Sequence, residues 1–461
     1  MKLVILGGGG FRVPLVYGAL LGDHAEGRVT EVVLHDLDAG RLGAIARVLA
    51  DQAAGVPDAP AVTATTDLDE ALRGADFVFS AIRVGGLEGR AADERVALAE
   101  GVLGQETVGA GGIAYGLRTV PVAVDIARRV RQHAPDAWVI NFTNPAGLVT
   151  EAMSRHIGDR VIGICDSPVG LGRRVARMLG GNPDEAFIDY VGLNHLGWLR
   201  GLRIAGRDEL PRLLGDREML GSFEEGRLFG AEWLQSLGAV PNEYLHYYYF
   251  NREAVRAYQE AEQTRGAFLR DQQARFYEEL GRGETPSAAA STSASISASA
   301  PALKAWDATR AEREATYMAE NREAAGVGER AAEDLESGGY EKVALALMRA
   351  IARDERTTLI LNVRNRTTLS ALDADAVIEV PCSVDANGAH PMAVDPLPLH
   401  ATGLVCAVKA VEREVLSAAE SGSRSTAVKA FALHPLVDSV AVARRLVEGY
   451  RGVHPGLGYL R

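Results

Sequence analysis

The side chains best suited to chemistry lie in three short segments of the first half of the chain. They are Asn141-Phe-Thr-Asn144-Pro145, Cys165-Asp166 and Asn194-His195. Together they offer a thiol, an imidazole, a carboxylate and several carboxamides, and they follow a glycine-rich loop of the kind that binds nucleotides. Because thiol and imidazole groups are metal ligands, the combination predicts redox chemistry on a sugar at a metal ion, beyond that of a plain dehydrogenase.

Cys165 and His195 are the candidate metal ligands. Two protein ligands are too few for a closed zinc site, which needs four, so substrate oxygens and water would complete the site. Cys165 follows an apolar run and is therefore expected at the carboxyl end of a strand, where ligands bind in open α/β sheets. Taken singly, each residue is equally compatible with an ordinary core position.

The elements that must position these residues alternate between strand and helix. Apolar runs predict buried strands at 2–6, 31–36, 76–80, 137–141 and 160–164, and helices at 12–21 and 119–133. Such alternation indicates a parallel sheet with helices on both faces. We therefore predict an α/β fold whose residues 1–190 form a Rossmann-like, doubly wound, NAD-binding domain.

The pattern changes after about residue 190. Helical segments dominate (253–280, 302–322, 401–420 and 436–450), and 357–363 and 376–380 are expected to be strands of a second sheet. We expect residues 191–461 to form a mixed α+β domain for substrate, metal and oligomerisation. Within it, the low-complexity segment 287–301 predicts a mobile loop, either a solvated insertion or a lid over the active site.

The glycine loop runs Leu6-Gly-Gly-Gly-Gly-Phe11 between the first strand and the first helix. It matches the dinucleotide pattern G-x-G-x-x-G only in part, because Arg12 occupies the third glycine position. Asp36 ends the second strand, where an acid binds ribose hydroxyls and favours NAD over NADP. A simple tight turn and a surface aspartate are the alternatives. The predicted cofactor-binding residues are Gly7, Gly9, Gly10, Phe11, Arg12, Asp36 and Asn141.

Two further segments complete the candidate site. Arg90 is expected in the first turn of a helix that begins near Gly89, where the helix end and the guanidinium both favour an anion. The alternative is a surface ion pair. The aromatic segment 241–250 contains Tyr244 and Tyr247. A tyrosine acts as a general base only where cations or a metal lower its pKa, and core packing or sugar stacking is the alternative.

Bulk properties restrict the classes of function. The net charge of −12 argues against a nucleic-acid or anionic-membrane partner. Three cysteines in 461 residues make a disulfide framework implausible, which fits a reducing cytoplasm. We read no signal peptide and no apolar run near the ~18 residues of a membrane span. Apolar helices in the second half suggest a homodimer or homotetramer.

These motifs together resemble glycoside hydrolase family 4, the NAD- and manganese-dependent glycosidases. The resemblance runs from Met1 to about residue 450 and is most specific in Pro135-Asp-Ala-Trp-Val-Ile-Asn-Phe-Thr-Asn144-Pro145 and Arg160-Val-Ile-Gly-Ile-Cys165. Gly104-Gln-Glu-Thr107 and Gly111-Gly-Ile-Ala114 are similar to the family's loop near the nicotinamide. The branch that the chain resembles most contains 6-phospho-β-glucosidases.

The resemblance implies a mechanism that differs from the two-carboxylate scheme of most glycosidases. NAD⁺ takes hydride from C3, the ketone acidifies the C2 proton, a tyrosine removes it, and a divalent metal stabilises the enediolate. The glycosidic oxygen leaves by elimination, water adds, and bound NADH restores C3. The implied roles are Mn²⁺ ligands for Cys165 and His195, C2 base for Tyr244 or else Tyr247, leaving-group acid for Asp166, 6-phosphate binding for Arg90, and sugar binding for Asn144 and Asn194.

Three departures from the family pattern leave alternatives open. Phe11 replaces a frequent Ser or Thr, and Cys165-Asp166 is the pair typical of phospho-α-glucosidases rather than the Cys-Asn of many phospho-β members. The family's Arg-Gly-Gly-Ala-Tyr-Tyr-Ser phosphate segment has only a partial counterpart in Arg313-Glu-Ala-Thr-Tyr317. The alternatives are a 6-phospho-α-glucosidase, an unphosphorylated glycosidase of the same family, a simple NAD-dependent hydroxy-acid dehydrogenase, and a non-catalytic nucleotide sensor.

Overall fold

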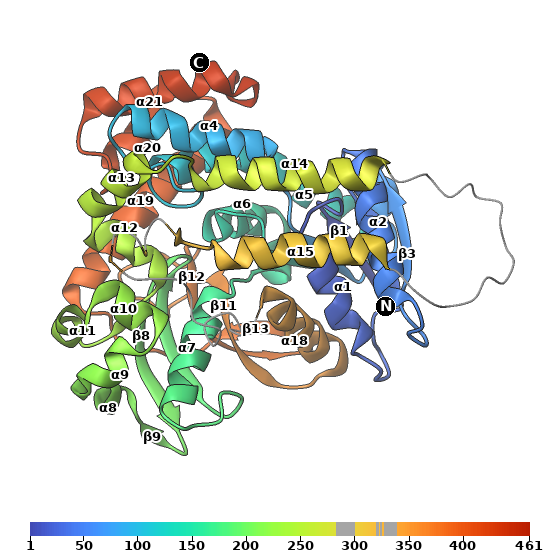
Figure 1. The fold of residues 1–461 in the computed structure, drawn as a ribbon, viewed down its shortest axis with the longest axis horizontal. Helices are drawn as coiled ribbons and strands as arrows, with labels where there is room; N and C mark the ends of the chain where they lie inside the picture. Colours follow the sequence, from blue (N-terminus) through green and yellow to red (C-terminus); the bar gives the residue numbers. More distant parts are fainter. Residues whose placement is uncertain (283–299, 320–321, 323–324, 327–338) are drawn as a thin grey trace, which may run out of the picture.

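A single mixed sheet runs through the molecule in the computed structural model, which describes residues 1–282, 300–319, 322, 325–326 and 339–461 (Figure 1). Six parallel strands lie in the order β3-β2-β1-β4-β5-β6, which is the Rossmann order. The predicted α/β class is therefore confirmed. The strands are β1 (Lys2–Leu6), β2 (Glu31–His35), β3 (Ala61–Thr65), β4 (Phe77–Ser80), β5 (Trp138–Asn141) and β6 (Val161–Gly163).

The sheet continues past β6 with antiparallel strands from the second half of the chain. β11 (Thr357–Arg364) pairs with β6 through Asn362 and Gly163. The prediction of a second sheet was therefore wrong, because the later strands extend the first sheet at its β6 edge. The predicted boundary between two domains near residue 190 stays a prediction. Beyond β11 follow β12 (Val377–Asp385), β7 (Phe187–Leu193), β8 (Leu196–Ile204) and β10 (Val240–Pro241), with β13 (Gly388–Pro391) on β12 and β9 (Arg207–Asp208) on β8.

Helices cover the sheet and wrap its ends (Figure 1). The first half contributes α1 (Val13–Leu21), α2 (Ala39–Ala53), α3 (Leu68–Leu72), α4 (Gly86–Ala99), α5 (Gly109–His133), α6 (Ala146–Ile157) and α7 (Ser167–Met178). The second contributes α8 (Leu210–Gly215), α9 (Arg217–Gly221), α10 (Glu224–Phe229), α11 (Ala231–Leu237), α12 (His246–Tyr249), α13 (Asn251–Glu260), α14 (Arg265–Arg282), α15 (Pro301–Ala315), α18 (Tyr340–Arg353), α19 (Leu399–Ser421), α20 (Arg424–Leu433) and α21 (Val440–Val453). Short 3-10 turns include Glu243–Leu245.

Several predicted segments differ from the observed elements, among them the helices expected at 119–133 and 302–322, which span Gly109–His133 and Pro301–Ala315. The helix expected at 253–280 is two helices, α13 and α14, because Ala261 takes an extended backbone conformation. The helix expected near Gly89 begins at Gly86, after Gly85 in the left-handed region, so Arg90 lies beyond its first turn. The low-complexity segment falls outside the described residues up to 299, and Pro301 already begins α15.

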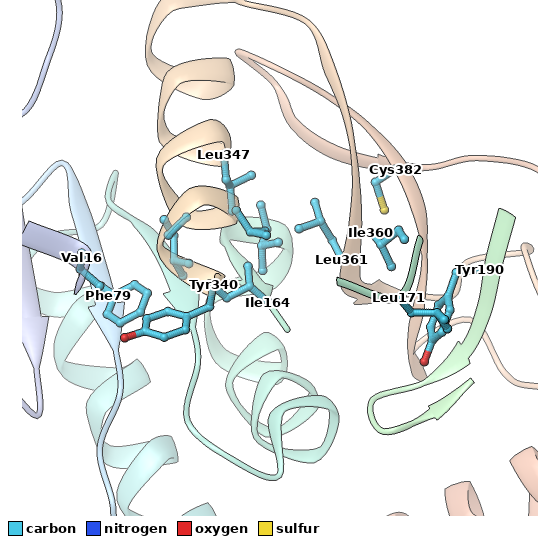
Figure 2. Close-up of a cluster of buried hydrophobic side chains, with 14 of the residues drawn as sticks. Val16, Phe79, Ile164, Leu171, Tyr190, Tyr340, Leu347, Ile360, Leu361 and Cys382 are labelled. Atoms are coloured by element: carbon cyan, nitrogen blue, oxygen red, sulfur yellow. The ribbon is translucent and has the colours of Figure 1, made fainter. Parts of the chain in front are cut away.

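The main hydrophobic core joins the two parts of the sheet. Figure 2 shows Tyr340 and Leu347 of α18 beside Phe79 of β4 and Ile164, and the same cluster continues to Leu361 of β11. These side chains are almost completely buried. A site between the two parts is therefore held from both sides by one packed core. Within the described part of the chain, no helix has both the length and the apolar character needed to cross a membrane.

Candidate active site

A large cleft of about 1410 Å³ lies at the carboxyl ends of the parallel strands and is closed by later helices. Its position follows the general rule that ligands bind there in open α/β sheets. Its lining combines the glycine loop with side chains from α4, α14, α15 and α18. The predicted residues that line it are Gly7, Gly10, Phe11, Arg12, Asp36, Arg90, Asn144, Cys165, Asp166, His195, Tyr244 and Tyr247.

The glycine loop is shaped by close contacts between neighbouring strands. Gly7 has a φ of +78°, and a Cβ there would lie 2.6 Å from the carbonyl oxygen of Ala81, so no other residue fits without displacement. The amide of Gly8 donates to the carbonyl of His35 (2.8 Å). Gly9 is not part of the cleft lining, and its amide donates to Asp36 Oδ2 (3.1 Å).

Asp36 therefore both lines the cleft and holds the glycine loop. Its second oxygen, Oδ1, accepts from the amide of Asp38 (3.2 Å). A carboxylate has about four acceptor sites, so two hydrogen bonds leave capacity for the ribose hydroxyls of a dinucleotide. This arrangement is compatible with NAD.

Phe11 has a packing role that explains its departure from the family pattern. Its ring is buried, meets Phe276 of α14 edge-on (5.3 Å between centroids, 87°) and packs against Trp306 of α15 (6.0 Å). The ring thus packs against two later helices. It has no hydroxyl with which to hydrogen-bond a pyrophosphate, unlike the Ser or Thr that the family often has there.

Backbone carbonyls of the loop are also bound by aromatic side chains from the second half of the chain. The three donors share a polar tip on an aromatic ring that is buried in Trp306 and Tyr340 and partly buried in Tyr277. They are Tyr277 Oη to Gly9 (2.7 Å), Trp306 Nε1 to Phe11 (2.8 Å) and Tyr340 Oη to Arg12 (2.7 Å). The conformation of the cofactor loop therefore depends on α14, α15 and α18.

His195 is oriented by a hydrogen-bond chain behind the cleft. Gln105 Oε1 accepts from the amide of Thr107 (2.7 Å) and from its hydroxyl (3.1 Å). Thr107 Oγ1 lies 2.7 Å from His195 Nδ1. Because the only hydroxyl hydrogen of Thr107 is directed to Gln105, its oxygen accepts from Nδ1–H of His195. This tautomer leaves Nε2 as a free lone pair, the state that a metal ligand requires.

The two predicted ligands fit a metal that takes its other ligands from substrate and water. Burial lowers the pKa of His195 to about 4, so its imidazole is neutral. Burial and the charges of Glu379 and Asp166 raise the pKa of the Cys165 thiol, an effect that a bound cation would oppose. The described residues contain no group of three or more His, Cys, Asp or Glu side chains that could hold an ion by themselves.

The two candidate tyrosines have different surroundings. The ring of Tyr244 stacks on His195 with 3.8 Å between centroids and 6° between planes. Its hydroxyl lies 3.1 Å from that of Tyr317. Tyr247 is more deeply buried, and its hydroxyl lies 3.2 Å from that of Tyr258. Tyr244 is therefore the tyrosine placed beside the candidate metal ligand.

Positive charge gathers at one end of the cleft. Arg90 is already paired with two carboxylates, Glu94 (3.0 Å) and Glu106 (2.5 Å). Arg313, by contrast, has no ion pair among the described residues. Burial and the charges of Arg12, Arg265 and Arg90 lower its pKa. An anion bound here would relieve this excess of positive charge, and the sequence signal for it was only the partial segment that begins at Arg313.

The remaining predicted residues are not all brought together. Asp166 directly precedes α7 and lines the cleft with Asn144. Asn141 is completely buried, and its amide nitrogen donates to Thr150 Oγ1 (3.1 Å) and to nearby carbonyls. Asn141 is the last residue of β5, and its side chain holds the turn that follows instead of lining the cleft. Asn194 donates to Glu379 (3.3 Å) and faces a separate small cavity.

Comparison with known proteins gives consistent matches along the chain. The family model for the family 4 glycosyl hydrolases matches residues 2–181, and that for their C-terminal domain matches residues 190–437. A probable 6-phospho-beta-glucosidase of Bacillus subtilis is 31% identical over 467 residues, which cover 98% of this chain and 96% of that protein.

Two solved structures are similar over almost their whole length. The 6-phospho-beta glucosidase of Thermotoga maritima, solved with manganese, NAD⁺ and glucose-6-phosphate, has a TM-score of 0.80 and 25% identity over 99% of this chain and 98% of that one. A 6-phospho-alpha-glucosidase from gut microorganisms, solved with NAD and Mn²⁺, has a TM-score of 0.78 and 26% identity with the same coverage. With both family models matched and the Rossmann cleft in place, this chain belongs to the family 4 glycosyl hydrolases.

Proposed function

We propose that this protein hydrolyses 6-phospho-β-glucosides with NAD⁺ and Mn²⁺ as cofactors. The observation that carries the proposal is the juxtaposition of Tyr244 with His195 in the same cleft as the glycine loop. When bound, NAD⁺ would supply a hydride acceptor for C3, and the divalent metal would supply positive charge near O2 and O3. Relatives with both anomeric specificities support the phosphoglucoside substrate class.

The protein's own residues would then handle protons and hold the sugar. Tyr244 takes the C2 proton, because its ring stacks on the candidate metal ligand His195 in the same cleft. Asp166, at the start of α7, gives a proton to the departing glycosidic oxygen. Asn144 hydrogen-bonds to the sugar near O2 and O3. Cys165 and His195 hold the metal, and Thr107 keeps the imidazole in the tautomer that binds it.

The 6-phosphate is assigned mainly to Arg313. Arg90 was the sequence-based candidate, but its charge is already offset by Glu94 and Glu106. Arg313 makes no ion pair among the described residues, and the opposing charge of Glu106 acts on it beside the like charges of Arg12 and Arg265. Such a group of guanidinium side chains is suited to bind a dianion.

The α-anomer is the second candidate substrate. The pair Cys165-Asp166 favours it, because this pair is typical of the phospho-α-glucosidase branch. An elimination mechanism that starts at C3 does not by itself select the anomer. The substrate class is therefore tested with both anomers side by side.

The experiment measures nitrophenol release from p-nitrophenyl 6-phospho-β-glucoside, the α-anomer and the unphosphorylated glucosides, with and without NAD⁺ and Mn²⁺. We expect release that requires both cofactors, without net NADH formation. Stoichiometric NADH would instead favour the hydroxy-acid dehydrogenase. Release that is independent of NAD⁺, from protein shown to carry none, would refute the mechanism.

We also propose a homodimer or homotetramer in the cytoplasm. Leu433 of α20 and Val440 and Val453 of α21 are large apolar side chains that are 41–52% exposed, and all three cysteines are free. Light scattering at micromolar concentration tests the assembly, and a monomer there would contradict it.

A further inference from the structure

A chain of hydrogen bonds leads away from the candidate base Tyr244. Its hydroxyl lies 3.1 Å from the hydroxyl of Tyr317. Tyr317 in turn donates to Glu243 Oε1 (2.7 Å). The same carboxylate oxygen accepts from Ser167 Oγ (3.2 Å). These contacts join the segment before α12 to α7 and to the residues that follow α15.

The direction of the hydrogen bonds follows from the number of hydrogens available. An ionised carboxylate has no hydrogen to give, so the hydroxyl of Tyr317 donates its single hydrogen to Glu243. The oxygen of Tyr317 must then accept from Tyr244. The hydroxyl hydrogen of Tyr244 therefore points along the chain, and the remaining lone pair of Tyr244 is free to accept a proton from a sugar in the cleft.

The surroundings of Glu243 suit a reversible proton acceptor. It is 5% exposed. Burial, together with Glu224 and Glu225 of α10, raises its pKa to about 7, while Arg174 of α7 and the hydrogen bond from Tyr317 oppose the rise. Groups whose pKa lies near the working pH are the most effective in proton transfer.

We propose that Tyr317 and Glu243 form a proton relay for Tyr244 in the C2 deprotonation step. The inference rests on the proposed function. As the C2–H bond breaks, its electron pair stays on the sugar and its proton forms a new O–H bond on Tyr244. The original proton of Tyr244 moves to Tyr317, and that of Tyr317 moves to Glu243. The base thus never has to exist as a tyrosinate, and the steps run in reverse when C2 regains its proton.

Tyr317→Phe and Glu243→Gln interrupt the relay in different places. The first removes one oxygen and breaks the chain in the middle. The second keeps a hydrogen-bonding side chain of the same shape but removes the proton acceptor. Tyr249→Phe is the matched control, because it removes a tyrosine hydroxyl from the same aromatic segment, where that group accepts from Trp198 Nε1 (3.0 Å) outside the relay.

The experiment compares kcat, KM and deuterium isotope effects at C2 and C3 for the wild type, the two variants, the double variant and the control. It uses whichever 6-phosphoglucoside anomer the wild type hydrolyses, with NAD⁺ and Mn²⁺ present. We expect kcat to fall by ~10²-fold or more in each relay variant, with KM little changed. The C2 isotope effect should rise and the C3 effect should fall, because proton abstraction becomes slower than hydride transfer.

The double variant provides a second criterion. Residues that act as one unit give non-additive losses, so it should be no slower than the slower single variant. Additive losses, or an active Tyr317→Phe enzyme with an unchanged C2 isotope effect, would overturn the relay alone. A wild type that hydrolyses neither anomer would overturn the proposed function and the relay with it. If Glu243→Gln does not fold, Tyr317→Phe still decides between these outcomes.

Discussion

Removal of the Asp93 carboxylate should destabilise the whole helical layer that supports the cleft. Asp93 of α4 binds both terminal nitrogens of Arg118 of α5 at 2.7 Å. Its Oδ1 also lies 2.8 Å from His454 Nε2, just after α21. The side chains of Asp93 and Arg118 are 2% and 3% exposed. One buried carboxylate therefore links α4, α5 and the residue that follows α21.

The magnitude follows from what Asp93→Ala leaves behind. Arg118 Nε already has no hydrogen-bond partner among the described residues, so the variant would leave the entire buried guanidinium without a hydrogen bond in this part of the chain. Breaking a buried ion pair in this way costs about 3–5 kcal/mol. Removing the charge of Arg118 as well, in the double variant Asp93→Ala/Arg118→Leu, should restore part of the lost stability, because no isolated charge then remains buried.

Equilibrium unfolding in guanidinium chloride, followed by tryptophan fluorescence, measures the effect. We expect the midpoint of Asp93→Ala to fall clearly below that of the wild type and the double variant to lie between them. Asp125→Ala is the control, because Asp125 is 58% exposed in its ion pair with Arg129 on α5, and such pairs contribute little. The reasoning would be refuted if Asp93→Ala had the midpoint of the wild type, or if the double variant unfolded at a lower denaturant concentration than Asp93→Ala.

Three further predictions address the metal, the phosphate and pH. Thr107→Val should weaken Mn²⁺ binding ~10–100-fold, because it removes a hydrogen bond that supports a metal ligand, whereas Thr107→Ser should not weaken it. Mn²⁺ affinities of the two variants and the wild type are measured by electron paramagnetic resonance. Equal affinities in Thr107→Val and the wild type would argue against the tautomer assigned to His195. Arg313→Gln should lower kcat/KM for the 6-phosphoglucoside ~10–100-fold, which is the equivalent of losing a charged hydrogen bond of about 1.5–3 kcal/mol. If kcat/KM for the unphosphorylated glucoside falls by the same factor, the phosphate binds elsewhere. Burial lowers the folded-state pKa of both His246 and His434 from 6.5 to about 4, so the unfolded chain binds more protons between these values. Their contribution to stability is therefore complete above pH 6.5 and is lost as the pH falls toward 4; unfolding midpoints that do not fall over this range would contradict it.

Much of the first half of the fold could be predicted from local pattern alone. Runs such as Lys2–Leu6 and Trp138–Asn141 are short and apolar, and helices separate them, which is enough to imply parallel strands. The later strands could not be placed in this way. The pairing of Asn362 with Gly163 joins residues far apart in the chain, and no local pattern shows which sheet edge a strand will meet.

The candidate site shows the same limit. Cys165 follows a predicted strand, and its place in the cleft was foreseeable. His195 lies with a φ of +61° in the turn between β7 and β8, although the sequence there lacks the Asn-Gly signal of such turns. Glu243 and Tyr317 meet only because the residues after α15 lie against the 3-10 turn Glu243–Leu245, which is far away in the sequence. Asn141 was predicted to bind the cofactor, but a carboxamide at the end of a strand can instead hydrogen-bond to the turn that follows, as Asn141 does.

The aromatic donors to the glycine loop have a consequence for how the protein is made. Tyr277, Trp306 and Tyr340 are synthesised long after the loop whose carbonyls they bind. The loop and its partners therefore form contacts of high sequence separation, which are slow to close. During synthesis the nucleotide-binding half emerges first but lacks these partners. We expect a nascent chain that ends before α14 to bind NAD⁺ poorly, so that cofactor capture marks the completion of the protein rather than its beginning.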